Sequence, residues 1–516
     1  MFKWLVRELG FDSPLIALVS PLEYRLGAAS LGLHTLFRIL NRYGLVDLFF
    51  YDKPYGLRTG KPLSDFHLII FSVSFELDYP RVIEILERSG LSPFRRERPF
   101  QTVVAGGIAP SANPAPIAPF FDAIVVGEAE STLPRMMEAF VPGSVDETLE
   151  VWRGLDFLYM QDEKETALRS FEPEPEKFES FSAFLDPSVV FGNSFLIEIM
   201  RGCPHKCRFC LLSYVTLPPR YRSLMPFLAD IEKLPMGTSV GLVASAVSDH
   251  PELVDFLKAI PKNVSYVTVS SLRADRITEE MLIQLKKHGM RTLTIAPEAG
   301  TERLRMAINK PIPDEVILDV ARMAQKLGFP RLKLYFMIGL PGETDEDVAA
   351  IPTLVDRIRS RFTGAVSVTV SGFVPKPHTP FQFVPFTPVK VMKKRARLLK
   401  MKDVELHVDA GRQTELQAVL SRGDTLLSDV ILHSARTGEP LRSALKVKNI
   451  DINRYLEDES YFREAPFRRI DMGVGDRFLD VEFRKFVRGL PTAPCEVGRC
   501  RACNVCRTLF QKVHRG

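Results

Sequence analysis

Three closely spaced cysteines directly follow a short apolar segment, and this feature constrains the fold more than any other. Cys203, Cys207 and Cys210 come after residues 194–200, whose apolar run is typical of a buried β-strand. The thiols are therefore expected on a loop at a strand end. Three clustered thiolates suit an iron–sulfur cluster, which normally takes four cysteines, so one iron would stay open. The alternatives are a zinc site, with His205 as a fourth ligand, and three unrelated core cysteines.

The spacing C-x3-C-x2-C, with Phe209 before the last cysteine, resembles the radical S-adenosylmethionine (SAM) superfamily. In that family three thiolates hold a 4Fe–4S cluster whose fourth iron binds the amino and carboxylate groups of SAM. Electron transfer into the sulfonium then releases a 5′-deoxyadenosyl radical. The resemblance implies a radical SAM enzyme with these cofactors, a SAM contact from Phe209, and a reductant such as flavodoxin or ferredoxin as a partner.

Length and cysteine usage set the broad class. A chain of 516 residues is expected to form two or three domains. All seven cysteines fall in two tight clusters, which fits metal binding in a reducing compartment better than disulfides. No apolar run approaches the length of a membrane span. We therefore expect a cytoplasmic protein with no membrane partner.

Residues 1–155 alternate apolar strands with helices, which predicts a doubly wound (Rossmann-like) parallel sheet. The expected strands are 15–19, 46–51, 67–75, 102–105 and 123–126, and the expected helices are 27–41 and 79–89. Ligands of such sheets bind beyond the carboxyl ends of the strands. An acidic, proline-bearing stretch, 156–193, is expected to be an interdomain linker.

Glycine-bearing loops at 31–33, 105–110 and 127–130 resemble the cobalamin-binding-like domain that precedes many radical SAM barrels. The resemblance makes cobalamin a candidate cofactor, although no Asp-x-His-x-x-Gly offers a lower axial histidine. The alternative is that the glycines only allow tight turns. Methylthiotransferases of the superfamily carry N-terminal cysteines for a second cluster. Residues 1–202 contain none, so that activity is not expected.

Residues 194–385 are predicted to form a partial (β/α)6 TIM-type barrel. Its strands are expected at 194–200, 239–246, 265–271, 292–296, 332–339 and 365–372, with helices at 251–259, 278–287, 313–327 and 345–361. By resemblance, residues at the strand ends contact SAM. They are Ala244, Ser245, Ser270, Ser271, Arg273, Glu298, Gly339 and Leu340. The segment containing Ala244 and Ser245 departs from the Gly-Gly-Glu that is usual in the superfamily.

The remaining residues, 386–516, are expected to form a helical region. Residues 390–402 carry seven basic side chains and no acidic one, which indicates either RNA contact or a solvated helix face. Further arginines lie near the C-terminus; they are Arg484, Arg488, Arg499, Arg501 and Arg507. Structured RNA is the substrate that this charge favours, and a peptide or small molecule remains the alternative.

Four more cysteines lie within one dozen residues of the tail: Cys495, Cys500, Cys503 and Cys506. Their compact spacing, C-x4-C-x2-C-x2-C, is more typical of a second iron–sulfur cluster than of zinc. With this tail, nearly the whole chain resembles one little-characterised radical SAM family whose members are thought to act on RNA. The rival functions are a cobalamin-dependent radical SAM methylase and a non-catalytic iron–sulfur protein that binds RNA or senses redox state.

Overall fold

The computed structural model describes residues 3–6, 13–161 and 166–506, which form two compact units. Unit 1 contains residues 1–193 and 416–473, and unit 2 contains residues 194–415 and 474–516. Each unit is thus built from two separate stretches of chain. This differs from the expected domains, because the C-terminal region is divided between both units.

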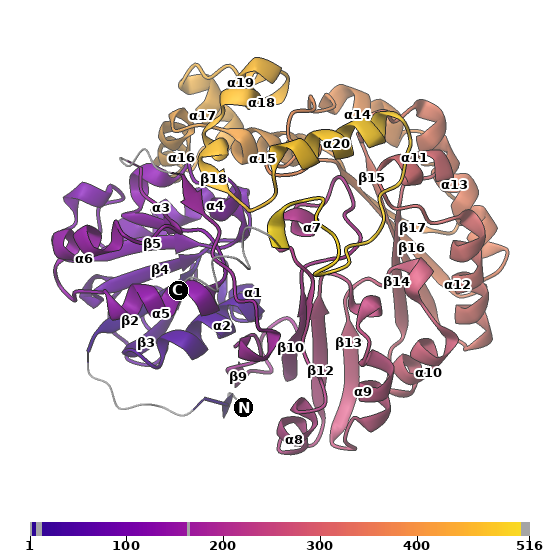
Figure 1. Cartoon of the computed structure of the whole chain (residues 1–516), viewed down its shortest axis with the longest axis horizontal. Coiled ribbons are helices and arrows are strands. Elements are labelled where there is room, and N and C mark those ends of the chain that lie inside the picture. The colour runs from indigo at the N-terminus through magenta and orange to yellow at the C-terminus, as the bar shows by residue number, and fades with distance from the viewer. Residues whose placement is uncertain (1–2, 7–12, 162–165, 507–516) are drawn as a thin grey trace. The chain divides into compact units, whose positions relative to one another are not determined.

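Unit 1 is built on a six-stranded sheet with the order β3-β2-β4-β5-β6-β7 (Figure 1). Its strands are β2 (Leu15–Ser20), β3 (Leu45–Phe50), β4 (Leu68–Ser72), β5 (Thr102–Gly106), β6 (Ala123–Val125) and β7 (Leu158–Tyr159). All are parallel except β7, which pairs antiparallel with β6. The winding reverses at β2, between β3 and β4. The predicted doubly wound sheet is confirmed.

Helices of unit 1 cover this sheet with their apolar faces. They are α1 (Tyr24–Gly27), α2 (Leu31–Leu40), α3 (Tyr79–Arg88), α4 (Ile108–Ala112), α5 (Ala129–Glu138) and α6 (Val145–Trp152). In α2, Leu33, Phe37 and Leu40 follow the three-to-four spacing of one helix face and are buried in the core of the unit. The three-to-four spacing of the apolar residues therefore predicted this helix correctly.

The expected linker is part of unit 1 wherever the structure describes it. Strand β9 (Phe184–Leu185) pairs with β1 (Lys3–Trp4), and β8 (Ala167–Leu168) pairs with β18 (Ile470–Asp471). The aromatic side chains of Phe157 and Phe184 are buried in the core. Isolated aromatic residues among the acidic ones thus anchor a segment whose average composition indicated a linker.

The second stretch of unit 1 is mostly helical. It comprises most of α15 (Arg412–Arg422), together with α16 (Leu426–Thr437), α17 (Leu441–Val447), α18 (Asn453–Leu456) and α19 (Glu459–Glu464). Helix α16 packs on α3, and Arg436 Nε lies 2.7 Å from Glu87 Oε1 across them. The buried Glu76 accepts hydrogen bonds from Gln417 and Ser421. Buried polar contacts therefore hold this stretch to unit 1.

Unit 2 contains the predicted partial barrel. Its parallel strands are β10 (Ser194–Arg201), β12 (Thr238–Ala244), β13 (Val264–Val269), β14 (Thr292–Glu298), β15 (Arg331–Ile338), β16 (Ala365–Gly372) and β17 (Glu405–Asp409). A bridge between Leu272 and Ile295 links the sheet ending in β13 to the sheet beginning with β14. The short β11 (Arg220–Tyr221) pairs antiparallel with β10. The six predicted strands are confirmed, and β17 corrects the expectation of helices throughout the tail.

Helices α9 (Leu253–Ala259), α10 (Glu279–Lys287), α12 (Asp314–Lys326) and α13 (Asp345–Arg359) confirm the four predicted barrel helices. The remaining helices of unit 2 are α7 (Leu212–Val215), α8 (Phe227–Glu232), α11 (Glu302–Ala307), α14 (Val389–Ala396) and α20 (Asp476–Val487). Among the described residues of both units, no helix is long and apolar enough to cross a membrane.

Candidate functional site

The three cysteines lie on the loop that follows β10, as predicted. Gly202 turns the chain into this loop with φ of +82°, and a Cβ there would lie 2.7 Å from two backbone oxygens, those of Thr216 and Pro218. Only glycine therefore fits this close approach. Cys203 and Cys207 are buried, whereas Cys210 is half-buried. One loop thus presents three thiols at the carboxyl end of a barrel strand.

Arg208 anchors the cysteine loop from within. Its side chain has no exposed surface, and Nε and Nη2 lie 3.2 and 3.1 Å from one carboxylate oxygen of Glu482, which is equally buried on α20. The guanidinium also donates to the backbone oxygens of Ala307 and Leu490. This buried network fixes the loop against α11 and the tail of unit 2.

Asn309 makes a second connection among the same segments. Its Nδ2 donates to the backbone oxygens of His205 and Lys206, and its Oδ1 accepts from the backbone N–H of Thr492 at 2.8 Å. The side chains of Arg208, which lies within the cysteine motif, and of Asn309, which lies outside it, therefore hold the loop in its conformation. No sequence rule links either residue to the cysteines, so the sequence analysis missed both.

The electrostatics of the thiols fit a cationic metal centre. Burial and the neighbouring Cys207 raise the pKa of Cys203 to about 12, and burial also raises the pKa of Cys207. Arg273 and Lys310 oppose this shift at Cys207. Buried thiolates that repel one another become stable when metal binding offsets their charge. The donor set therefore fits an iron–sulfur cluster held by three cysteines.

His205 is engaged elsewhere. Its Nε2 lies 2.9 Å from both carboxylate oxygens of Asp249, and Asp249 also pairs with Arg276 at 2.9 Å. The zinc alternative for the first loop needs an imidazole nitrogen as its fourth ligand. Since the carboxylate occupies Nε2, the geometry favours His205 as a support of the loop.

Two of the expected SAM contacts converge on Cys207. Arg273 Nη1 lies 3.6 Å from Cys207 Sγ, and Arg273 Nε lies 2.8 Å from Asp275 Oδ1. Glu298 ends β14 with φ of +70°, and its carboxylate lies 2.9 Å from the ammonium of the buried Lys310. Lys310 was not among the predicted site residues, because a lysine beside a proline in a loop carries no spacing signal.

Apolar residues complete the surroundings of the loop. Phe209 packs against the cluster that contains the buried Leu340, and Ala244 packs against the cluster that contains Cys203. Gly339 has φ of +87°, and a Cβ there would lie 2.9 Å from Met392 Sδ. Ser245, Ser270 and Ser271 are exposed at the ends of β12 and β13. The structure thus brings Phe209 together with Leu340 and Ala244 with Cys203, whereas the three serines remain exposed.

The carboxylates of the loop after β15 form a hydrogen bond and ion pairs that fix the loop conformation. Glu343 accepts from the backbone N–H of Gly339 at 2.7 Å and pairs with Arg395 at 2.7 Å, and burial raises the pKa of Glu343 to about 7. Asp345 pairs with Lys394 at 2.9 Å and Arg395 at 3.2 Å. Two residues of the basic run at 390–402 are therefore engaged within unit 2.

The tail cysteines lie against the first cysteine loop within unit 2. The backbone N–H of Cys495 donates to Pro204 O at 2.7 Å. Burial, together with repulsion from Cys503, Cys506 and Cys500, raises the pKa of Cys495 to about 11. Asn504 has φ of +69°, a left-handed conformation that asparagine adopts more readily than most residues. Four mutually repelling thiols again form a donor set that fits a metal centre.

A site for one metal ion needs several ligating side chains that point toward a common centre. Within the described ranges, no three His, Cys, Asp or Glu side chains are arranged to hold one metal ion. The two cysteine sets are therefore characterised by their spacing, burial and mutual repulsion. Arg507, the last predicted basic residue of the tail, lies outside the described residues.

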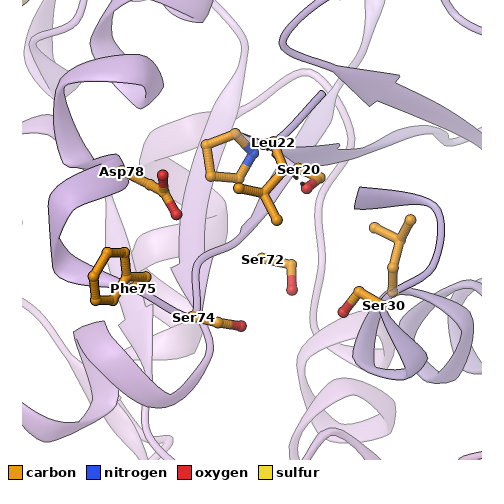
Figure 2. Close-up of a pocket in the computed structure, with 9 residues that line it drawn as sticks. Ser20, Leu22, Ser30, Ser72, Ser74, Phe75 and Asp78 are labelled. Atoms are coloured by element: carbon orange, nitrogen blue, oxygen red, sulfur yellow. Dashed lines mark hydrogen bonds between the residues drawn. The ribbon is translucent and has the colours of Figure 1, made fainter. Parts of the chain in front are cut away.

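Unit 1 has a pocket at its switch point, beyond the carboxyl ends of β2 and β4 (Figure 2). Its volume is about 240 Å³. Serine hydroxyls, the ring of Phe75 and the carboxylate of Asp78 line it, and the full lining is Ser20, Pro21, Leu22, Ser30, Leu33, Ser72, Ser74, Phe75 and Asp78. Sites for drug-sized ligands usually span roughly 300–1,000 Å³. The pocket therefore fits a nucleoside-sized group, such as the nucleotide end of cobalamin, and not a corrin ring.

Two of the loop glycines of unit 1, Gly107 and Gly127, lie directly against other backbone segments of the same unit. A Cβ on Gly107 would lie 2.2 Å from Val73 O, and one on Gly127 would lie 2.2 Å from Ser170 O. Asn113, directly after α4, donates to the backbone oxygens of Ser421 and Gly423 at 3.1 and 2.8 Å. Gly107 and Gly127, with φ of +111° and +135°, thus allow close approach of backbone segments within unit 1.

Comparisons with known proteins decide the family. The model for "Radical SAM superfamily" matches residues 197–355, and that for "Radical SAM proteins, N-terminal" matches residues 52–156. An uncharacterized protein of Methanocaldococcus jannaschii is 31% identical over 448 residues, which cover 86% of this chain and 95% of that protein. The chain belongs to the radical SAM superfamily. It is therefore an enzyme of a class that uses a 4Fe–4S cluster and SAM and needs a reductant.

More distant relatives have defined names. The tRNA-2-methylthio-N(6)-dimethylallyladenosine synthase of Coxiella burnetii is 24% identical over 336 residues, which cover 60% of this chain and 68% of that protein. The radical SAM methyltransferase TsrM of Kitasatospora setae matches with a TM-score of 0.50 and 17% identity, over 74% of this chain and 76% of that one. This second likeness shows a shared fold.

Truncating the two polar groups near Cys207 is expected to weaken SAM binding. A lost hydrogen bond to a charged group costs roughly 1.5–3 kcal/mol, or tenfold and more in affinity. We expect this loss in Arg273→Ala and Glu298→Ala by equilibrium dialysis, with the iron of the first loop retained. Arg322→Ala, at an exposed arginine of α12, is the control. SAM affinity unchanged in both variants would place Arg273 and Glu298 outside the SAM site.

Proposed function

We propose that this radical SAM enzyme modifies RNA. Cys203, Cys207 and Cys210 are the residues that hold the 4Fe–4S cluster. When bound, that cluster supplies the electron for reductive cleavage of SAM. The described residues around it bind and orient SAM, and an arginine-bearing surface of α20 and the tail binds the RNA.

The side chains near Cys207 supply the SAM contacts in this proposal. Arg273 offers its guanidinium to the SAM carboxylate, since this planar group pairs with a carboxylate through two hydrogen bonds. Glu298 accepts from the amino group or ribose hydroxyls, and Lys310 holds its carboxylate in place at 2.9 Å. Phe209 and Leu340, which share one apolar cluster, exclude water from the adenine side.

The observation that carries the RNA proposal is an exposed set of arginines on α20 and the tail. Arg477, Arg484 and Arg488 are spaced by seven and four residues, which places them along one helix face. Arg499 and Arg501 are also exposed. None of the five forms an ion pair with a carboxylate in the part of the chain that the structure describes. Free guanidinium groups in a row suit the phosphates of a nucleic acid.

A relative supports the same substrate class. The Coxiella burnetii protein is named as a tRNA-modifying synthase, and it matches 60% of this chain. The present chain lacks cysteines before residue 203, so we do not extend the methylthio transfer of that name to it. Comparing nucleoside masses in RNA from cells with and without the protein would identify the modification.

Charge reversal on α20 is expected to weaken RNA binding. Each lost phosphate contact lowers the salt dependence of binding by about one unit, and Arg484→Glu with Arg488→Glu should raise the Kd for structured RNA roughly tenfold or more. Binding at two or more salt concentrations measures both effects. Lys287→Glu with Arg291→Glu, at exposed positions in and just after α10, is the matched control. Equal losses in both double variants would contradict a specific RNA surface on α20.

Cobalamin-dependent methylation is the second candidate function, and the switch-point pocket is the observation that favours it. TsrM, which shares the fold, is named as a methyltransferase. The pocket has room for the nucleotide end of the cofactor and not for its corrin ring. Purified protein made with added cobalamin would show corrinoid absorbance under this candidate and none under the first.

A further inference from the structure

Lys206 lies between the first two cysteines of the loop, and its charge is buried. The residue is 2% exposed and has φ of +54°. Its backbone oxygen accepts from Tyr214 Oη at 3.1 Å and from Asn309 Nδ2 at 3.1 Å. These contacts set the backbone so that the side chain extends toward the tail of unit 2.

The ammonium group has few partners among the described residues. Its Nζ lies 3.4 Å from Ala493 O, at the limit of a hydrogen bond, and 6.0 Å from the centre of the Phe478 ring. No carboxylate of the described chain forms an ion pair with it. A buried ammonium without a counter-ion costs several kcal/mol, so its position calls for an anion.

The tail cysteines lie next to the segment that this ammonium contacts, and as metal-bound thiolates they would supply the opposite charge. Ala493 is two residues from Cys495, and the backbone N–H of Cys495 donates to Pro204 O, two residues before Lys206. On the other side of the tail loop, the backbone N–H of Gly475 donates to Cys503 O.

We propose that Lys206 is the counter-charge of an anionic four-thiolate metal centre formed by Cys495, Cys500, Cys503 and Cys506. The cysteine spacing makes this centre an iron–sulfur cluster, and the inference rests on our proposed function of a radical SAM enzyme. One loop thus supplies three ligands to the first centre and the compensating cation to the second. Lys206 is a positioning residue in this arrangement, since it acts through charge and binds no metal.

A buried cation beside a cluster changes its redox properties. Reduction adds one electron, and no bond forms or breaks at the cysteines. Because the added charge is negative, a nearby ammonium stabilises the reduced state and raises the reduction potential. A low-potential donor of the flavodoxin or ferredoxin class supplies the electron. Lys206 therefore makes the tail centre easier to reduce.

Two variants of Lys206 separate charge from packing. Lys206→Met removes the charge and keeps most of the side-chain volume, whereas Lys206→Arg retains the charge. Both are made in full-length protein with Cys203, Cys207 and Cys210 replaced by Ala, so that the tail centre alone gives a signal. Potentials are measured by redox titration followed by electron paramagnetic resonance, and metal content by elemental analysis.

The expected result is a lower reduction potential in Lys206→Met, equivalent to at least about a tenfold weaker preference for the reduced state, with recovery in Lys206→Arg. If the centre holds zinc, the Met variant instead loses zinc to a chelator about tenfold more readily and gives no redox signal. A Met variant that matches the unmutated Lys206 protein in both potential and chelator resistance would overturn the inference. A tail that binds neither iron nor zinc with Lys206 intact would instead contradict the proposed second centre.

Discussion

Replacing Cys203, Cys207 and Cys210 together with alanine is expected to abolish formation of 5′-deoxyadenosine. The three thiols are the ligands that the first loop offers, and without them no cluster can deliver an electron to SAM. The assay uses anaerobically reconstituted protein, dithionite and SAM, with chromatography to quantify 5′-deoxyadenosine. The same samples give iron per chain.

A matched variant replaces the four tail cysteines instead. With two 4Fe–4S clusters the unmutated protein should hold about eight irons, and either set of replacements should remove about half. The tail variant should still cleave SAM in part, because its first loop is unchanged. Continued SAM cleavage in the triple variant at the first loop would show that the cluster assignment is wrong.

Removing Glu482 is expected to cause the largest loss of stability among single substitutions. Arg208 and Glu482 are both fully buried and lie 3.1 Å apart. Glu482→Ala leaves the guanidinium buried without its carboxylate, and breaking a buried pair in this way costs about 3–5 kcal/mol. Because Arg208 lies between Cys207 and Cys210, the first centre should also lose iron more readily.

Urea unfolding of the protein and iron release to a chelator measure these two effects. Glu280→Ala is the control, since Glu280 pairs with Lys258 at 3.2 Å where both side chains are about half exposed. A solvent-exposed pair of this kind contributes little to stability. Similar unfolding midpoints for the two variants would show that α20 does not depend on the buried pair.

The strands and helices of both sheets could be predicted because their apolar patterns are strong. Residues 15–20 and 194–201 are almost wholly buried, so their continuous apolar runs gave the right positions. Strand β17 was missed because it lies at the end of its sheet and most of its side chains are exposed. An edge strand with charged residues carries little of the signal on which such predictions depend.

It was harder to predict which segments belong to each unit than to predict the positions of the helices and strands. The second stretch of unit 1, residues 416–473, is far from the first in sequence and is held by contacts such as Glu76 with Gln417. Residues 156–193 read as a linker because acidic residues outnumber the aromatic residues that anchor them. Contacts between segments far apart in the sequence depend on how the folded segments fit together, and local composition does not indicate this fit.

Of the candidate functional site, too, only a part could be predicted from the sequence. Cysteine spacing predicted both donor sets, and the strand ends predicted Arg273 and Glu298 as SAM contacts. Lys310, Lys206 and the Arg208–Glu482 pair were missed, because a buried charge is recognised only when its surroundings are known. The basic run at 390–402 was correctly noted as cationic, yet Lys394 and Arg395 pair with acidic residues after β15.

SAM cleavage by the reduced, unmutated protein tests the central claim most directly. Full-length protein with its full iron content is mixed with dithionite and SAM, with and without structured RNA, and 5′-deoxyadenosine is quantified over time. We expect 5′-deoxyadenosine to form in both samples and faster with RNA. Its absence from both samples, at full iron content, would contradict the assignment of this chain as a radical SAM enzyme.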